Sequence, residues 1–383
     1  MKRPRFLFRT VLVSIMLMSL PSFGGDKGSF SQEPVTNSGR KWRIGYYEGG
    51  EYIDYRKIFT ETVQGLMTLG WIEYVEIPKQ HGEQTRPLWE WLSKNIQSDY
   101  ITFVRDAHYS ARWDEDIRRQ TAAAIIDRLN RRQDIDLLIA MGTWAGKDMA
   151  NDNHHTNTMV LSASDPIAAG IIKSIDDSGY PHLHAQADPF RYERQLRVFH
   201  EIVHFRKLGV AYEDSEDGRS YAAMDVVERL AKERGFEIVR CHTKSDIADV
   251  AEAEQSVVQC FESLAEKVDA IYVTLQGGIN SRSIPRLVQI ANANQVPTFS
   301  QSGSEEVKCG FFVSLSQAGF KYVGEFHAST IAKVFNGARP NELEQLFQEP
   351  ARIAINLKTA EIIGFDPPVV LLGAADEIYR EIY

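Results

Sequence analysis

Short apolar segments that alternate with amphipathic ones constrain the fold of this chain more than any other feature. The apolar segments run without polar alternation: WRIGYY (42–47), DLLIAMG (136–142), TMVLSAS (158–164), KLGVAYE (207–213), DAIYVTL (269–275) and PTFSQS (297–302). Such runs are typical of strands buried on both faces of a parallel sheet. Helical spacing of apolar residues follows at 58–69, 114–131, 219–234 and 281–294. The alternation predicts doubly wound α/β layers.

The strand–helix series occurs twice along the chain. The first series runs from Trp42 to about residue 165, and the second begins near Pro189. Residues 166–188 carry glycine, proline and aspartate and indicate a connection. Two series of this size predict two lobes. Residues 72–99 fit neither pattern, so we interpret them as an insertion before a strand at 100–106.

Composition narrows the class of protein. The 383 residues are 43% hydrophobic and 25% charged, as in folded globular proteins. The formal net charge is -9 and the body of the chain has no run of lysine and arginine, so we expect no nucleic-acid partner. The one long apolar stretch lies at the N-terminus, which excludes a multispan membrane protein.

The first 25 residues have the layout of a secretory signal peptide. A basic start precedes a short apolar run, a proline and small residues: Lys2, Arg3 and Arg5, then residues 11–20, then Pro21 to Gly24. An uncleaved anchor or a buried core helix is the alternative. Residues 26–40 are polar and are expected to form a flexible lead-in. No cysteine lies near the expected cleavage point, so we expect no lipid anchor.

The chain has three cysteines, Cys241, Cys260 and Cys309. This number rules out a disulfide scaffold and a CxxC metal array. One bridge with a remaining thiol and three buried free thiols are both compatible with the sequence.

The residues that follow the predicted strands are the candidates for a binding site, because open parallel sheets bind ligands at the carboxyl ends of their strands. Hydroxyl groups and helix N-terminal amides there suit a carboxylate, and Glu48 or Asp165 suits an ammonium group. Tyr47, Trp144 and Tyr322 suit stacking on an apolar or aromatic group. Ordinary turn and helix-capping chemistry is the alternative explanation for the polar residues.

Several segments in a fixed order carry a resemblance to a known family: AMGTWAGKDMA, SASDPIAAGI, GVAYEDSEDGRS, VDAIYVTLQGGI, VPTFSQSGSEEVKCG, FKYVGEFHASTIAKVFNGARP and AINLKTAEIIGFDPPVVLLGAADEI. Together they resemble the ABC-transporter substrate-binding protein family, whose characterised members include tryptophan- and tyrosine-binding lipoproteins. The resemblance covers nearly the whole chain after the N-terminal segment.

The resemblance implies a type 1 periplasmic-binding-protein fold. Two doubly wound, Rossmann-like α/β lobes are joined by a hinge of three crossovers and close on a ligand. Each lobe is then discontinuous in sequence. We expect lobe 1 at 41–168 and 317–350, and lobe 2 at 169–316 and 351–383.

The strand-end analysis and the resemblance together give the expected ligand-binding residues: Tyr47, Glu48, Thr143, Trp144, Ser164, Asp165, Glu213, Thr274, Gln276, Gln301 and Tyr322. One position departs from the family. Members commonly have Asp-Asn where this chain has Gln276-Gly277, so the ligand's identity need not carry over.

A competing motif is HEIVH at 200–204, which fits the HExxH pattern of zinc proteases. On a helix, His200 and His204 would share a face, with Glu201 near a zinc-bound water. The extended motif needs glycine and then histidine, but FRKLGV follows; Glu216 and Glu228 remain as candidate third ligands. The resemblance makes this segment the helix before the KLGVAYE strand, so coincidence is favoured. Neither a phosphate-binding glycine loop nor a GxSxG elbow occurs.

From these observations we expect a periplasmic solute-binding protein that hands a small molecule to an ABC permease in the inner membrane. We expect an amino acid as ligand, with an aromatic one favoured, and a monomer without catalysis, cofactor or metal. The alternatives are a ligand-sensing subunit for a membrane receptor or kinase, and a zinc hydrolase using His200, Glu201 and His204.

Overall fold

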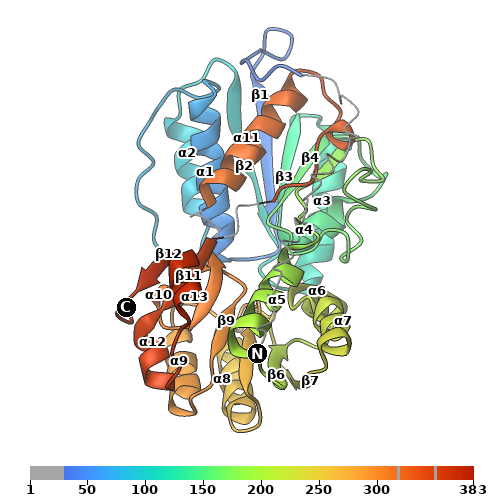
Figure 1. The fold of residues 1–383 in the computed structure, drawn as a ribbon. Coiled ribbons are helices and arrows are strands. Elements are labelled where there is room, and N and C mark those ends of the chain that lie inside the picture. The colour runs from blue at the N-terminus through green and yellow to red at the C-terminus, as the bar shows by residue number, and fades with distance from the viewer. Residues whose placement is uncertain (1–29, 317–319, 349–351) are drawn as a thin grey trace, which may run out of the picture.

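The computed structural model describes residues 30–316, 320–348 and 352–383. The expected signal peptide at 1–25 lies outside the described residues. The chain forms two α/β lobes, one above the other in Figure 1. In the described part of the chain, no helix is both long and apolar enough to cross a membrane.

The first lobe is built on a five-stranded parallel sheet in the order β2-β1-β3-β4-β5. Its strands are β1 (Trp42–Glu48), β2 (Ile101–Ser110), β3 (Leu137–Met141), β4 (Asn157–Leu161) and β5 (Leu183–Ala185). Its helices are α1 (Ile53–Thr68), α2 (Arg86–Asn95), α3 (Glu115–Arg131), α4 (Gly142–Met149) and α11 (Lys321–Phe335), with a short 3-10 turn at Pro340–Glu342.

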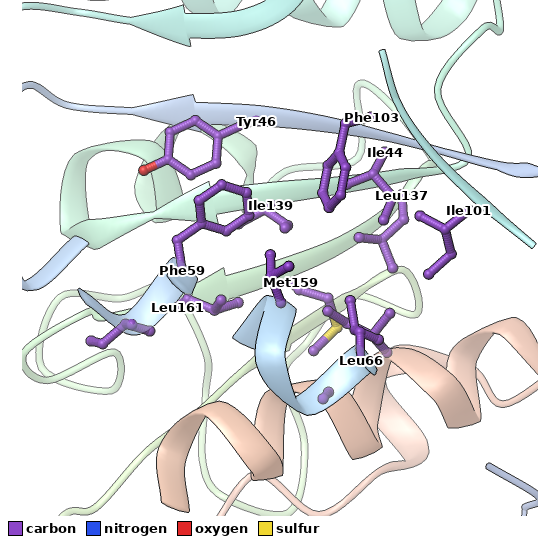
Figure 2. Packing of buried hydrophobic residues seen from close by; sticks show 14 of the residues in the cluster. Ile44, Tyr46, Phe59, Leu66, Ile101, Phe103, Leu137, Ile139, Met159 and Leu161 are labelled. Carbon is purple, nitrogen blue, oxygen red and sulfur yellow. The ribbon is translucent and has the colours of Figure 1, made fainter. Parts of the chain in front are cut away.

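Helices α1 and α11 cover one face of this sheet, although they lie far apart in sequence (Figure 1). Small residues allow the close approach: a methyl group on Gly65 would lie 2.7 Å from the Cβ of Ala328. Beneath the helices lies a core of aliphatic and aromatic side chains, in which Phe59 and Leu66 of α1 meet Phe103 and Ile139 of the sheet (Figure 2). This packing fixes the segment after residue 320 to the first lobe.

The second lobe contains a seven-stranded sheet in the order β12-β11-β10-β9-β8-β6-β7. Strands β10 and β11 pair antiparallel, and the other pairs of this sheet are parallel. The strands are β6 (Lys207–Tyr212), β7 (Glu237–His242), β8 (Ala270–Val273), β9 (Thr298–Ser300), β10 (Val313–Ser316), β11 (Arg352–Asn356) and β12 (Ala375–Tyr379). The helices are α5 (Arg191–Val203), α6 (Glu216–Tyr221), α7 (Met224–Arg234), α8 (Val250–Ala265), α9 (Ile284–Ala293), α10 (Ser304–Lys308), α12 (Leu357–Ile363) and α13 (Val369–Ala374).

The chain passes between the lobes three times: after β5, between β10 and α11, and between residue 348 and β11. The expected fold, with two α/β lobes and three crossovers, is confirmed. The first crossing differs in position from the expected division at residue 168. Strand β5 pairs in parallel with β4, so the chain leaves the first sheet only after Ala185. Strand β5 has only three residues and no strong apolar pattern, so the sequence did not predict a strand there.

Three local features also differ from expectation. The helix expected at 219–234 is divided into α6 and α7 at Ala223, which has a positive φ of 51°. Residues 72–99 include α2, whose Leu88, Trp89 and Leu92 are buried in the first core. The segment expected as a flexible lead-in is held to the first lobe, because the Trp71 indole donates to the Gln32 carbonyl (2.9 Å).

Of the two cysteine states compatible with the sequence, the structure has the single bridge. Cys241 at the end of β7 and Cys260 on α8 form a disulfide, and Cys309 is free. The bridge ties an outer strand of the second sheet to the helix that follows it.

Candidate functional site

A cavity of about 130 Å³ lies between the two lobes. Both contribute to its lining, through residues that follow parallel strands and residues in the first turns of helices. Its polar and aromatic lining includes Tyr52, Asp54, Tyr55, Trp113, Thr143, Ser162, Ser164, Asp188, Arg191, Arg194, Tyr221, Ser245, Asp246 and Gln276.

The first lobe supplies hydroxyl groups and a helix N-terminus. Helix α4 starts directly at the end of β3, which places Thr143 in its first turn and in the cavity wall. Ser162 and Ser164 follow β4 at the same edge of the sheet. The free N–H groups of a helix N-terminus and nearby hydroxyls favour an anionic group. This part of the cavity therefore suits a carboxylate.

Gly142 allows this arrangement. It has a φ of +85°, and a methyl group on it would lie only 1.9 Å from the hydroxyl oxygen of Tyr55. Only glycine adopts this backbone conformation without strain while leaving room for the tyrosine. The contact joins the first turns of α1 and α4, so Tyr55 is fixed where the two helices meet.

Aromatic side chains form a second part of the wall. Tyr52 and Tyr55 lie in an edge contact with ring centroids 5.3 Å apart, and Tyr55 is 6.4 Å from Trp113. Trp113 in turn rests against Trp144, 5.4 Å away, and Arg118 lies over the Trp144 ring at 4.5 Å. Rings held in this way present an apolar surface of fixed shape to a ligand.

Charged groups complete the lining. The Arg194 guanidinium donates to Asp188 (3.1 Å), and the Arg191 guanidinium donates to the Gln301 carbonyl (3.1 Å). Burial raises the pKa of Asp54, and the charges of Lys57 and Arg191 oppose this shift. Burial, reinforced by the charge of Glu213, raises the pKa of Asp246 to about 7. The cavity thus contains both cations and anions, of which Asp246 is the least compensated.

A family model described as ABC transporter substrate binding protein matches residues 112–378, more than half of the chain. The chain belongs to this family. The membership expected from the sequence motifs is confirmed.

The chain is also similar to individual proteins. The tyrosine-binding protein of Clostridioides difficile is 27% identical over 171 residues, which cover 44% of this chain and 46% of that protein. The chain therefore matches about half the length of this curated relative. A conserved domain protein from Vibrio cholerae has a TM-score of 0.67 at 19% identity, covering 88% of this chain and 99% of that one.

A further solved structure is an ABC domain from Streptococcus pneumoniae in complex with L-Trp. It has a TM-score of 0.66 at 18% identity and covers 88% of this chain and 99% of that chain. At such identities the likeness establishes the shared two-lobe fold.

Among the residues expected from the sequence to bind a ligand, Thr143, Ser164 and Gln276 line the cavity. Four others lie behind its wall. Tyr47 is fully buried and donates to Asp148 (2.6 Å), and Trp144 supports Trp113 from behind. Thr274 donates to the Ala211 carbonyl. Glu48 is buried beneath the insertion.

Glu48 belongs to a buried polar network. Its Oε2 accepts hydrogen bonds from the hydroxyls of Tyr46 (2.8 Å) and Thr85 (2.6 Å), and Thr85 also contacts the His108 Nε2 (2.8 Å). Burial raises the pKa of Glu48 to about 7, against the effect of these hydrogen bonds. Because Thr85 comes from the 72–99 insertion, the insertion covers a carboxylate that would otherwise face the strand ends.

Three of the four remaining expected residues have local partners. Asp165 accepts from the amides of Ile167 and Ala168, Glu213 accepts from the amides of Ser245 and Asp246, and the Gln301 Oε1 accepts from the Leu275 amide. Tyr322 is partly exposed on α11. None of these four lines the cavity. Their role in binding stays a prediction.

Sequence reasoning missed most of the lining. Tyr52, Asp54 and Tyr55 occupy the start of the helix after β1. A search that extended a few residues beyond the end of the strand would have included them. Asp246 follows β7, whose mixed polar sequence did not indicate a strand. Arg191 begins α5 just after the first crossing. Phe320 and Phe347 also line the cavity. They lie between the second and third crossings of the chain, and no local sequence pattern indicates that they face the cavity.

The HEIVH segment forms the end of α5. His204 ends the helix in a left-handed conformation (φ 55°), so the two histidines do not share a regular helical face. His200 packs against Phe205 and Phe236, and Glu201 pairs with Arg234 (3.4 Å). Among the described residues, no group of three or more His, Cys, Asp or Glu side chains is arranged to hold a metal ion.

Proposed function

We propose that this chain captures a small molecule in the cavity between its lobes and delivers it to an ABC permease. The ligand is an amino acid, with an aromatic one favoured, and the protein acts by binding alone. The observation that carries this proposal is a cavity lined by both lobes at their strand ends, in a chain that belongs to the ABC transporter substrate binding family.

The size and walls of the cavity favour an amino acid. One water needs about 10–15 Å³ of such space. A cavity of about 130 Å³ therefore has room for roughly nine to thirteen water-sized groups, which suits a molecule of amino-acid size. The first turn of α4 with Thr143 and Ser164 suits the ligand's carboxylate, and the rings of Tyr52, Tyr55 and Trp113 suit an aromatic side chain.

Closure of the lobes is the mechanism. A ligand that contacts both lobes gains all of its contacts only when they are closed, so it stabilises the closed state by its difference in affinity for the two states. The permease then has one conformation by which to recognise the loaded protein. Release follows when the lobes separate and the contacts of one lobe are lost.

Export to the periplasm is part of the proposal. The basic, apolar and small-residue layout of residues 1–25 supports cleavage by signal peptidase. Intact-mass measurement of protein from the periplasmic fraction should give a chain without about the first 25 residues. Full-length protein retained in the membrane would contradict this part of the proposal and leave the binding function unaffected.

A thermal-shift screen over amino acids and other small metabolites tests the binding function. A ligand at a hundred times its Kd adds about 2.7 kcal/mol to the free energy of unfolding. Calorimetry on each hit should give weaker binding for Tyr55→Ala than for Tyr74→Ala, since Tyr74 is 86% exposed on the insertion. X-ray scattering should show compaction with ligand. Equal affinity in both variants without compaction would place binding outside the cavity.

A further inference from the structure

The cavity contains three carboxylates, which differ in the charged groups around them. Asp188 is paired with Arg194. Asp54 lies in the first turn of α1, near the positive end of the helix, and is influenced by the charges of Lys57 and Arg191. Asp246 forms no ion pair with any lysine, arginine or histidine in the described part of the chain. Asp54 forms no ion pair there either, but Lys57 and Arg191 bring opposite charge to it, whereas the charge that Glu213 brings to Asp246 has the same sign.

The surroundings of Asp246 hold the carboxylate in place without neutralising it. Its Oδ2 accepts from the Tyr221 hydroxyl (3.0 Å) and its Oδ1 from the Ser245 hydroxyl (3.0 Å). The Oε2 of Glu213 accepts from the backbone amides of Ser245 (2.7 Å) and Asp246 (3.1 Å), which brings a second negative charge close to the first. An ionised carboxylate accepts about four hydrogen bonds, so Asp246 can accept about two more from a ligand.

Gln276, another polar side chain of the second lobe in the cavity wall, already has its hydrogen bonds within the protein. Its Oε1 accepts from the Thr243 hydroxyl (2.7 Å), and its Nε2 donates to the Ala211 carbonyl (2.9 Å) and the Thr274 hydroxyl (2.8 Å). Both amide hydrogens are used, and the side chain is 6% exposed. Turning it toward a ligand would break buried hydrogen bonds, each of which is costly to leave unmade.

We infer that the ligand of this cavity carries a protonated amine, and that Asp246, held by Tyr221 and Ser245, binds it. Tyr55 stands on the opposite lobe, close enough for its hydroxyl to be influenced by the charges of both Asp246 and Asp54. Its ring and that of Tyr221 offer aromatic surface to an ammonium group. The inference rests on the proposed function, and it names the residue that selects an amine.

The structure also explains why an amine is preferred to a neutral donor. Burial and the neighbouring Glu213 charge raise the pKa of Asp246, and Asp217 adds to this effect although its own charge is paired with Lys147. A cation placed between Asp246 and Tyr55 opposes that shift, because opposite charges favour ionisation of the carboxyl group. Charge-assisted hydrogen bonds of this kind are about twice as strong as neutral ones.

Matched ligands that differ in one group test the inference. The probes are L-tryptophan, tryptamine, which lacks the carboxylate, and indole-3-propionate, which lacks the amine, with the tyrosine series L-tyrosine, tyramine and 3-(4-hydroxyphenyl)propionate beside them. Calorimetry with the wild type should give binding of the amino acid and weaker binding of the amine. The acid without an amine should bind about ten- to a hundredfold more weakly than the amino acid.

The variant Asp246→Asn should bind the amino acid and the amine about ten- to a hundredfold more weakly than the wild type does. Its affinity for the deaminated acid should be unchanged. Asp249→Asn is the matched control, since Asp249 caps α8 three residues away and is exposed. Binding of the deaminated acid as tightly as the amino acid, or equal losses for both in Asp246→Asn, would overturn the inference and leave the proposed function standing. Absence of binding by every member of both series and of the wider screen would overturn both.

Discussion

The Nζ atom of Lys147 lies 2.8 Å from Oδ1 of Asp217, and this ion pair joins α4 of the first lobe to α6 of the second. The two side chains are 27% and 15% exposed. A second contact across the lobes runs from the Tyr192 hydroxyl to the Ser164 carbonyl (3.2 Å). Both contacts join the two lobes, so we expect them to favour the closed state.

Lys147→Met should therefore shift the protein toward an open state. A partly buried pair of this kind is worth about 0.5–1.5 kcal/mol, which corresponds to roughly a two- to tenfold increase in Kd. Calorimetry with the ligand found in the screen and X-ray scattering of the free protein measure the two effects. Arg197→Met is the control, because its partner Glu233 lies in the same lobe. Identical affinities for the two variants would exclude a contribution of the ion pair to closure.

Replacing Gly142 by alanine should damage both stability and binding. The positive φ costs about 1–2 kcal/mol and overpacking against Tyr55 about 1–3 kcal/mol, so urea unfolding should show a loss of at least about 2 kcal/mol. Because Tyr55 lines the cavity, the affinity for ligand should fall as well. Gly373→Ala is the control, since a methyl group there meets nothing within 4 Å. Wild-type affinity in a folded Gly142→Ala protein would refute the link to Tyr55.

Glu48→Gln should change how stability depends on pH. Burial raises the pKa of Glu48 from its ordinary 4.5 to about 7, so the folded state binds this proton more tightly than the unfolded state. The stability from this group is present below about pH 4.5 and is lost as the pH rises through about 7. Glutamine keeps an acceptor for Tyr46 and Thr85 but does not titrate. Between pH 5 and pH 8, the free energy of unfolding of the variant should therefore rise by up to about 3 kcal/mol relative to that of the wild type.

Urea unfolding of both proteins at pH 5, 6, 7 and 8 measures this difference. Glu90→Gln is the control, since Glu90 lies on α2 with its side chain 48% exposed. A constant difference between Glu48→Gln and wild type across the whole range would show that Glu48 does not titrate in this interval.

The disulfide should stabilise the second lobe. It closes a loop with a sequence separation of 19 residues, for which the chain-entropy model gives about 3 kcal/mol. Reduction of the wild type should lower the free energy of unfolding by about this amount. The double variant Cys241→Ser, Cys260→Ser should show the same loss and no response to reductant. Cys309→Ser should still lose stability when it is reduced. If reductant had no effect on Cys309→Ser, Cys309 would be part of the disulfide instead.

The HEIVH segment should act as an ordinary helix end. Purified protein should contain far less than one zinc per chain, and Glu201→Gln should bind ligand as the wild type does. Its ion pair with Arg234 is mostly exposed on the glutamate side, so the loss of stability should stay below about 1 kcal/mol. One zinc per chain, together with peptide cleavage that Glu201→Gln abolishes, would restore the hydrolase alternative.

The sequence by itself determined the elements with strong periodicity. The apolar runs at 42–47, 136–142 and 207–213 became β1, β3 and β6, because a strand buried on both faces needs a continuous apolar side-chain set. The helical spacing after β1 gave α1. The order of the motifs then gave the family and the fold, and the strand-end rule located Thr143 and Ser164 in the cavity.

Only the tertiary structure decided which strand-end residues face the cavity. Successive side chains of a strand point to opposite faces, so Glu48 and Tyr47 lie at the right strand end but turn into the core. Thr85, from an insertion far along the chain, covers Glu48, and Asp246 enters the cavity from a strand with a weak apolar pattern. A cavity between two lobes depends on contacts between distant segments, and local sequence patterns contain no information about those contacts.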